Sequence, residues 1–236
     1  FAIAEAFSKL GAQTVLVDKD ETTLKKAITK LGHGHGYFPI DVTEADAADQ
    51  AMLAAIQKFG GLDILVSNAG AAHAGPMLSI SNDELRNAFE LNFFSHYSFS
   101  TEAAKILKNQ NRGGQILFNI SKQAVNPGRN FGAYGLPKAT TFFLMRQLAL
   151  ELGSDGIRVN GINADRIRSG LLTDDFISSR AKSRGVSESE YMAGNLLGKE
   201  VTAEHVADAF TSLACAESTT GHVMTVDGGN IEASLR

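Results

Sequence analysis

The sequence contains a single cysteine, no tryptophan and only four prolines among its 236 residues. Cys215 therefore cannot form an internal disulfide, and no Cys-x-x-Cys pair is present to bind zinc, which is typical of a protein in the reducing cytoplasm. No apolar run approaches the ~18 residues that span a membrane. Basic residues are not in excess, because 22 lysines and arginines stand against 26 acidic residues. We therefore expect a cytoplasmic protein with no membrane span and no nucleic-acid partner.

Helical and strand patterns alternate along the whole chain. Hydrophobic residues make up 44% of it, which is enough for one sizeable core. Short apolar runs predict buried strands at 14–17, 37–40, 64–67, 115–120, 158–162 and 222–226. Apolar residues at helical spacing predict helices at 3–10, 24–31, 43–59, 81–107, 134–152 and 204–214. This order is that of an α/β fold, with a doubly wound, Rossmann-like parallel sheet in three α/β/α layers and one domain over 1–236.

Local signals predict two helix starts and one turn. Thr43 with Asp46 is typical of a helix start, and Ser81 with Glu84 has the spacing of a capping box. The stretch 33–36 alternates histidine with glycine and has no partner ligands, so we expect a turn there and no metal site.

Acidic residues follow the first two predicted strands. In a parallel sheet of this kind, ligands bind beyond the carboxyl ends of the strands. Asp18 can accept hydrogen bonds from ribose hydroxyls of a dinucleotide and repel a 2′-phosphate, or it can be a solvated turn residue. Asp41 with Val42 can hold an adenine amino group beside an apolar wall, or can simply lead into the next helix.

Small residues follow the third predicted strand. Asn68, Ala69 and Gly70 would let the backbone approach a flat ligand, and the amide of Asn68 can connect neighbouring strands. An ordinary turn is the alternative, because asparagine and glycine favour turns.

The most informative group consists of Ser121, Tyr134 and Lys138. Ser121 ends a predicted strand, Tyr134 begins a helix, and Lys138 lies four residues further on the same helical face. A tyrosine phenol titrates near pH ~10, and a fixed ammonium would lower that pKa. The pair then predicts a general acid–base, with Ser121 polarising a substrate oxygen.

Together these residues resemble the short-chain dehydrogenase/reductase family over essentially the whole chain. The matching positions occur in the family's order: Asp18, Asp41, Asn68, Ala69, Gly70, Asn92, Ser121, Tyr134, Lys138 and the terminal 226–229. The resemblance implies a nicotinamide cofactor that gives or takes a hydride. It favours NAD over NADP because of Asp18, although Lys19 leaves the alternative open.

The resemblance also implies a role for each site residue. Tyr134 would pass the proton, Lys138 would lower its pKa and hold the nicotinamide ribose, and Ser121 would bind the substrate oxygen. Asn92 would hold a water that connects Lys138 to solvent; alternatively, it is a helix asparagine bonded to nearby backbone. Ile167 aligns with the residue that meets the nicotinamide carboxamide, and Ser169 with a cofactor-binding threonine.

The chain departs from the family in two places. The glycine-rich phosphate loop and the strand before it are absent, so we predict that the natural protein continues upstream of Phe1. Where the family has Asn-Pro-Gly, this chain has Asn163, Ala164 and Asp165, followed by Arg166 and Arg168. These arginines predict either a site for a substrate phosphate or carboxylate, or an internal Asp–Arg pair.

Within the family, the residues near Tyr134 and after the sixth strand are most similar to the C-terminal dehydrogenase module of bifunctional rhamnulose-1-phosphate aldolase/short-chain dehydrogenase proteins. This resemblance implies a small hydroxyaldehyde, polyol or sugar-derived alcohol as substrate, and an aldolase domain fused upstream. A 3-oxoacyl-thioester reductase and a non-catalytic dinucleotide sensor are the alternatives.

Aromatic residues between 93 and 99 predict helix packing or a subunit contact, and the family implies a homodimer or homotetramer. The stretch 170–199 predicts a lid over the substrate.

Overall fold

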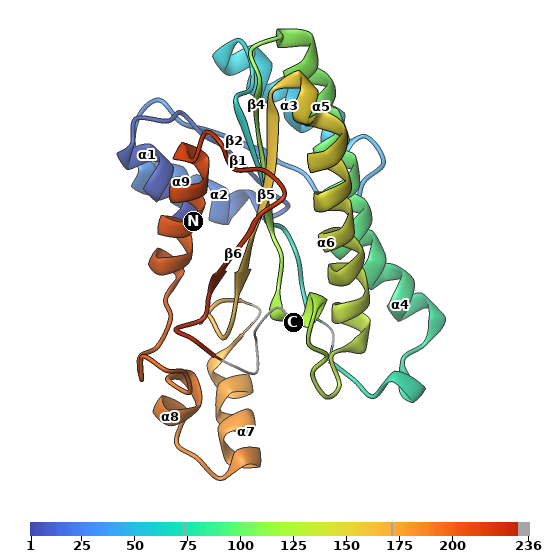
Figure 1. Ribbon diagram of the computed structural model, residues 1–236, viewed down its shortest axis with the longest axis vertical. Coiled ribbons are helices and arrows are strands. Elements are labelled where there is room, and N and C mark those ends of the chain that lie inside the picture. Colours follow the sequence, from blue (N-terminus) through green and yellow to red (C-terminus); the bar gives the residue numbers. More distant parts are fainter. Residues whose placement is uncertain (73, 171, 231–236) are drawn as a thin grey trace.

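The computed structural model describes residues 1–72, 74–170 and 172–230, arranged as Figure 1 shows. Its strands are β1 (Val15–Asp18), β2 (Gly36–Pro39), β3 (Ile64–Ser67), β4 (Gly114–Asn119), β5 (Ile157–Ala164) and β6 (Val223–Val226). All the strand pairs in this part of the chain are parallel. Because each predicted strand lies within one or two residues of its expected position, the α/β, Rossmann-like prediction is confirmed.

The helices are α1 (Ala2–Lys9), α2 (Glu21–Leu31), α3 (Ala47–Phe59), α4 (Asn82–Phe89), α5 (Ser95–Gln110), α6 (Gly132–Leu152), α7 (Asp174–Arg184), α8 (Glu188–Met192) and α9 (Ala203–Cys215). The predicted capping box of Ser81 and Glu84 is present and starts α4. The other predicted start is wrong, because Thr43 bonds the carboxylate of Asp41 and α3 begins only at Ala47. Among the described residues, no helix is long and apolar enough to cross a membrane.

A π-helical turn, Glu90–Phe94, joins α4 to α5. The sequence predicted an uninterrupted α-helix here, and the structure corrects this. The amide of Ser95 donates to the carbonyl of Glu90, five residues back, so the turn is wider than an α-helical one. Asn92 lies inside this wide turn.

The strands form two sheets rather than one continuous sheet. β1 pairs with β2, whereas β3, β4, β5 and β6 pair in that order, and no ladder joins β1 to β3 within the described ranges. The family resemblance predicts a further strand beside β1, and the described residues contain none there. One core nevertheless serves both sheets, because Val17 and Phe38 pack against the same cluster as Ile116 of β4. What lies upstream of Phe1 stays a prediction.

Helices cover both faces of the larger sheet (Figure 1). On one face, α1 and α9 pack against β4 through Phe7, Phe210 and Leu117. On the other face, Phe99 of α5 and Met145 of α6 belong to the main core cluster. Because the strands are parallel, the loops after their carboxyl ends emerge at one edge, which is where a ligand site is expected.

The stretch predicted as a lid contains α7 and α8, with residue 171 outside the described residues. These two short helices have a small core of their own, formed by Leu172, Ile177, Ala181, Tyr191 and Met192. Figure 1 shows them extending beyond the carboxyl ends of β5 and β6. The lid function itself stays a prediction.

Candidate active site

Ser121, Tyr134 and Lys138 come from the end of β4 and the start of α6. Tyr134 and Lys138 lie on one face of α6 and are buried, with 7% and 2% of their surfaces exposed. The helix starts locally where the amides of Tyr134 and Gly135 donate to the carbonyl of Phe131, at 3.1 and 2.7 Å. The structure therefore brings the predicted trio together, while the catalytic role of each residue stays a prediction.

The phenol of Tyr134 lies in apolar surroundings. Burial raises the pKa of Tyr134 above its ordinary value of 10.0, and a side-chain hydrogen bond with Ser121 acts in the opposite direction. Lys138 Nζ lies 5.9 Å from the centroid of the ring. The prediction that Lys138 makes the phenol acidic is therefore wrong for this structure, because the effect of burial is larger and the ammonium is directed elsewhere.

Lys138 is directed toward uncharged groups. Its Nζ donates to the carbonyl oxygen of Asn119 at 2.9 Å and lies 3.5 Å from Nε2 of His96. Burial lowers the pKa of Lys138 from 10.5 to about 8. This lysine therefore titrates much closer to neutral pH than an exposed lysine does.

His96 is a site residue that the sequence analysis missed. It is 1% exposed, and its Nδ1 shares a hydrogen bond of 2.6 Å with Oγ of Ser67, the last residue of β3. Burial holds the pKa of His96 well below its usual value, and the charge of Lys138 acts in the same direction. The imidazole is therefore a neutral partner of the lysine. Its place one turn after Asn92 was the available signal, but the surrounding aromatic residues indicated ordinary helix packing.

Asn92 connects its π turn to the loop after β3. Its side chain accepts from the amide of Ala71 at 3.2 Å and donates to the carbonyls of Ala71 and Ala88 at 3.0 and 3.1 Å. Its backbone carbonyl accepts from Thr141 of α6 at 2.7 Å. The alternative of an asparagine bonded to nearby backbone is thus what the structure contains, and the water-binding role stays a prediction.

Gly70 allows this close approach. A Cβ at position 70 would lie 2.8 Å from Oδ1 of Asn92 and 3.7 Å from Nζ of Lys138. Nearby, the side chain of Asn119 donates to Oδ1 of Asn68 at 2.8 Å, so Asn68 connects the ends of β3 and β4 as predicted. Ala69, between them, contributes a backbone hydrogen bond to His96.

The acidic residues after β1 and β2 lie at neighbouring strand ends. Asp18 is exposed and its carboxylate accepts from the amide of Asp20 at 3.0 Å. Hydrogen bonds from Thr43 lower the pKa of Asp41, and Lys19 lies 3.5 Å from that carboxylate. Val42 packs at the margin of the main core. An exposed carboxylate beside an apolar residue fits the adenosine half of a dinucleotide.

The remaining predicted cofactor residues follow β5. Ile167 packs at the margin of the second core cluster, which contains Leu117 and Ile162. The hydroxyl of Ser169 donates to the carbonyl of Ile167 at 3.2 Å and accepts from the amide of Leu172 at 3.3 Å. The hydroxyl of Ser169 therefore links Ile167 to Leu172 by two hydrogen bonds.

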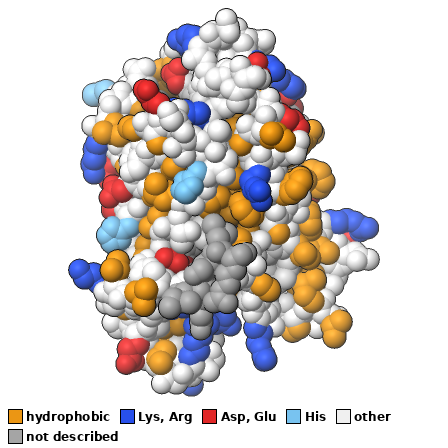
Figure 2. Space-filling view, in the orientation of Figure 1, with side chains coloured by type: hydrophobic (Ala, Val, Ile, Leu, Met, Phe, Trp, Pro, Cys, Tyr) orange, Lys and Arg blue, Asp and Glu red, His pale blue; other side chains and the backbone are white. Residues whose placement is uncertain are grey.

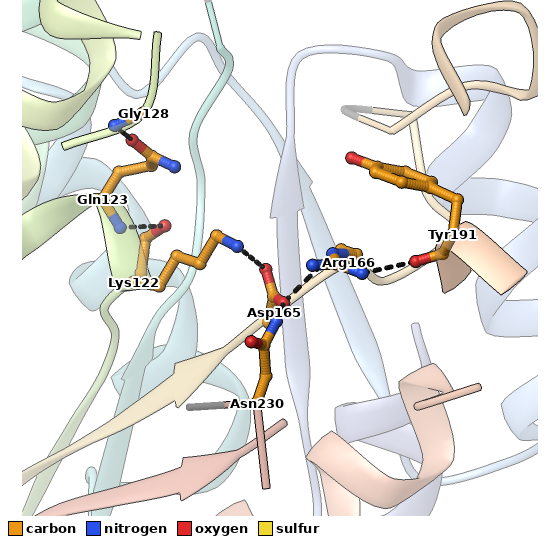
Figure 3. Close-up of polar contacts among 8 residues, drawn as sticks. Lys122, Gln123, Gly128, Asp165, Arg166, Tyr191 and Asn230 are labelled. Carbon is orange, nitrogen blue, oxygen red and sulfur yellow. Dashed lines mark hydrogen bonds and ion pairs between the residues drawn. The ribbon is translucent and has the colours of Figure 1, made fainter. Parts of the chain in front are cut away.

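Asp165 is the centre of a charged cluster that includes Lys122, the residue after Ser121 (Figure 3). It is 6% exposed and lies 2.6 Å from Nζ of Lys122, 3.3 Å from Nε of Arg166 and 2.5 Å from the amide nitrogen of Asn230. The guanidinium of Arg166 also donates to the carbonyl of Tyr191. Two cations thus share one buried carboxylate.

Arg168 is paired as well, with Asp174 at 2.7 Å and Glu200 at 2.8 Å. Both arginines that the sequence analysis singled out therefore have carboxylate partners. Of the two predicted uses, the internal ion pair is the one that the structure contains.

Comparisons with known proteins agree with this geometry. A family model described as enoyl-(acyl carrier protein) reductase matches residues 1–230. The chain is 31% identical to 7alpha-hydroxysteroid dehydrogenase of Escherichia coli, with 98% of this chain and 89% of that protein covered. It is 30% identical to (+)-borneol dehydrogenase 1 of Salvia officinalis, over 94% of this chain and 85% of that one. It is also 31% identical to the uncharacterized oxidoreductase YuxG of Bacillus subtilis. That match covers 97% of this chain but only 35% of the longer Bacillus subtilis protein.

Solved structures give the same result. The fold is similar to a 3-ketoacyl-(acyl-carrier-protein) reductase from Brucella melitensis complexed with NADH, with a TM-score of 0.88, 26% identity and coverage of 97% of this chain and 91% of that one. It is also similar to an acetoin dehydrogenase from Enterobacter cloacae, with a TM-score of 0.84, 25% identity and coverage of 99% and 91%.

Proposed function

The chain belongs to the short-chain dehydrogenase/reductase family of oxidoreductases, and from that premise we propose that it interconverts an alcohol and a carbonyl with NAD. The proposed substrate is a small hydroxyaldehyde, polyol or sugar-derived compound. One observation carries the proposal: Ser121, Tyr134 and Lys138 meet at the carboxyl end of β4. A hydroxyl and a phenol can polarise a carbonyl oxygen and deliver a proton to it, and an ammonium can bind the ribose of the cofactor.

The residues of this edge fit a dinucleotide. Asp18 and Asp41 would hold the adenosine half, Gly70 would lie along the dinucleotide, and Ile167 with Ser169 would face the nicotinamide amide. A bound nicotinamide would supply or accept the hydride. These assignments rest on strand-end position and on the family.

The proton is handled by the chain's own groups. Ser121 would hold the substrate oxygen by a hydrogen bond, and Tyr134 would pass a proton to or from that oxygen. Because burial raises the pKa of Tyr134, the phenol stays protonated at neutral pH and is suited to donate to a carbonyl oxygen. Lys138 would bind the ribose and receive its proton by way of Asn92.

The choice of NAD over NADP is supported by the end of β1. The exposed carboxylate of Asp18 would accept from the ribose hydroxyls and repel a 2′-phosphate. Lys19, the residue that left the choice open, lies 3.5 Å from Asp41 and is partly neutralised by it. NADP is therefore the less favoured cofactor.

A second candidate function is reduction of 3-oxoacyl thioesters. The description of the family model and the Brucella melitensis structure both support it. A sensor without turnover is the weaker alternative, because the trio at the end of β4 is complete.

We also propose that the chain works as one module of a longer aldolase–dehydrogenase protein, which is supported by its covering only 35% of the Bacillus subtilis relative.

We further propose a homodimer or homotetramer in the cytoplasm. Large apolar side chains are exposed on α5 and α6, where Tyr97, Phe143 and Leu150 are 47%, 69% and 79% exposed. Figure 2 shows hydrophobic side chains gathered along the side of the molecule on which α6 lies. Such a face suits a helix-to-helix contact between subunits. The free, exposed Cys215 supports a reducing compartment.

The proposal is tested by replacing the phenol while keeping its ring. Tyr134→Phe is expected to lower turnover of hydroxyaldehydes or polyols roughly 100- to 10,000-fold, because proton transfer is lost, with little change in NADH affinity. Turnover with both cofactors and NADH binding by fluorescence would be measured on the natural full-length protein. Tyr37→Phe, on β2, is the matched control and should behave as wild type. A Tyr134→Phe enzyme as active as wild type would refute the assignment, and turnover of acyl thioesters alone would select the second candidate.

A further inference from the structure

Helix α7 packs on the loop that leads into the catalytic helix. The rings of Phe176 and Phe131 meet edge to face, with centroids 5.8 Å apart and planes inclined at 80°. Phe131 is the residue whose carbonyl accepts from the amide of Tyr134 at the start of α6. Through Phe131, the face of α7 that carries Phe176 therefore contacts the start of the helix that carries Tyr134.

Arg180 projects from the same face of α7. Its guanidinium carbon lies 5.6 Å from the ring centroid of Phe131 and 5.8 Å from that of Phe176. Its Nε is buried and has no hydrogen-bond partner, and its guanidinium forms no ion pair within the residues that the structure describes. An N–H that is buried without an acceptor is costly, so an anion that accepts from this Nε would be stabilised here, and Arg180 as a whole is partly exposed.

The surrounding charges do not neutralise Arg180. The loop from 122 to 131 carries Lys122 and Arg129 and has no acidic residue. Lys122 is engaged by Asp165. Asp175 lies on the first turn of α7 but forms no ion pair with Arg180 among the described residues. Among the described residues Arg180 therefore has no carboxylate partner, in contrast to the paired arginines after β5.

On the basis of the function proposed above, we propose that Arg180 selects substrates that carry a carboxylate or a phosphate ester at the end remote from the reacting carbon. A guanidinium can bind either oxyanion through two parallel hydrogen bonds. Stacking against Phe131 and Phe176 holds its plane, so little conformational freedom is lost on binding. The arginines after β5 cannot do this, because their guanidinium groups already bind carboxylates and a carbonyl.

The test compares small aldehydes that differ only in the remote group: glyceraldehyde, glyceraldehyde 3-phosphate and a semialdehyde that ends in a carboxylate. Arg180→Met is expected to lower kcat/KM for the anionic substrates about 10- to 100-fold, mostly through KM, since a charge-assisted hydrogen bond contributes about 1.5–3 kcal/mol. Glyceraldehyde should change by less than about threefold. Arg184→Met, one turn further along α7, is the matched control because Arg184 stacks on Tyr191 instead.

The outcomes separate this inference from the function on which it rests. A selective loss with the phosphate or with the carboxylate supports the inference and identifies which oxyanion is bound. An equal loss with charged and neutral substrates assigns Arg180 a purely structural role and overturns the inference, as does a wild-type enzyme without preference for an anionic group. In both cases turnover persists, so the proposed function would stand. No turnover of any of these compounds with either cofactor counts against the function itself, and the inference is then overturned with it.

Discussion

Two lysines beside Ser121 have opposite environments. Lys138 is buried against a backbone carbonyl and the neutral His96, and burial lowers its pKa to about 8. Lys122 lies 2.6 Å from the carboxylate of Asp165, which also holds Arg166. The molecule thus separates a cation whose proton is loosely held from cations that are neutralised by a fixed carboxylate. We therefore expect Lys138, which has no carboxylate partner, to take part in the reaction. Lys122, which is held by Asp165, is expected to support the fold.

Replacing each lysine by methionine is the sharpest test of this contrast. Lys138→Met is expected to lower turnover roughly 100- to 10,000-fold. It should also stabilise the fold at pH 7, by up to about 3 kcal/mol, because the folded state no longer has to bury an ammonium. Lys122→Met should destabilise the fold, because it removes a partner of Asp165. Activity assays and thermal melts of both variants would measure these opposite signs.

The stability change at position 138 depends on pH in a defined direction. The folded-state pKa of Lys138 is about 8 and its ordinary value is 10.5, so the unfolded chain binds more protons between these values. Wild-type stability should therefore rise with pH across that window relative to Lys138→Met. A difference that stays constant from pH 7 to 10.5 would contradict the buried-ammonium account.

The carboxylate side of the comparison is tested by Asp165→Asn. This change leaves Lys122 and Arg166 without a carboxylate in a largely buried place, and the free energy of unfolding should fall by about 3 kcal/mol. Urea denaturation would measure it. Asp174→Asn is the control, because Asp174 pairs with Arg168 but its side chain is 84% exposed; it should change stability by less than about 0.5 kcal/mol. Equal effects of the two changes would mean that burial of the cluster contributes nothing.

The uncharged surroundings of Lys138 are tested by changing His96. This change has the smallest expected effect on activity. Leucine cannot accept a hydrogen bond from the ammonium, so His96→Leu should lower the pKa of Lys138 further. The basic limb of the pH profile of kcat/KM should then move to lower pH by up to about one unit. His96→Gln retains an acceptor and should restore the wild-type profile. A loss of activity without any shift in the profile would show that His96 only fills space.

Strand positions were predictable from the sequence because buried parallel strands are short apolar runs between turns. The runs ending at Asp18 and Ser67 differ from their predicted bounds by at most one residue. Asn68, directly after β3, and Ser121, two residues after β4, were predictable as site members because the topology brings the strand ends to one edge.

The parts that could not be predicted depend on contacts between distant segments. His96 meets Lys138 across the interior, and its place one turn after Asn92 was too weak a signal to predict that contact. The pKa of Tyr134 was predicted in the wrong direction, because spacing along a helix does not report how deeply a phenol is buried. Arg166 and Arg180 look alike in the sequence, and only the folded chain distinguishes a paired guanidinium from an unpaired one.

The π turn at Glu90–Phe94 sets the rotational phase of the rod formed by α4 and α5. Winding the same residues as a regular α-helix would rotate every side chain beyond the turn by about 100° relative to α4, which is the rotation of one residue. Asn92 and His96 would then face away from the loop after β3 and from α6. The extra residue held in the wide turn therefore decides which side chains of α5 reach the site.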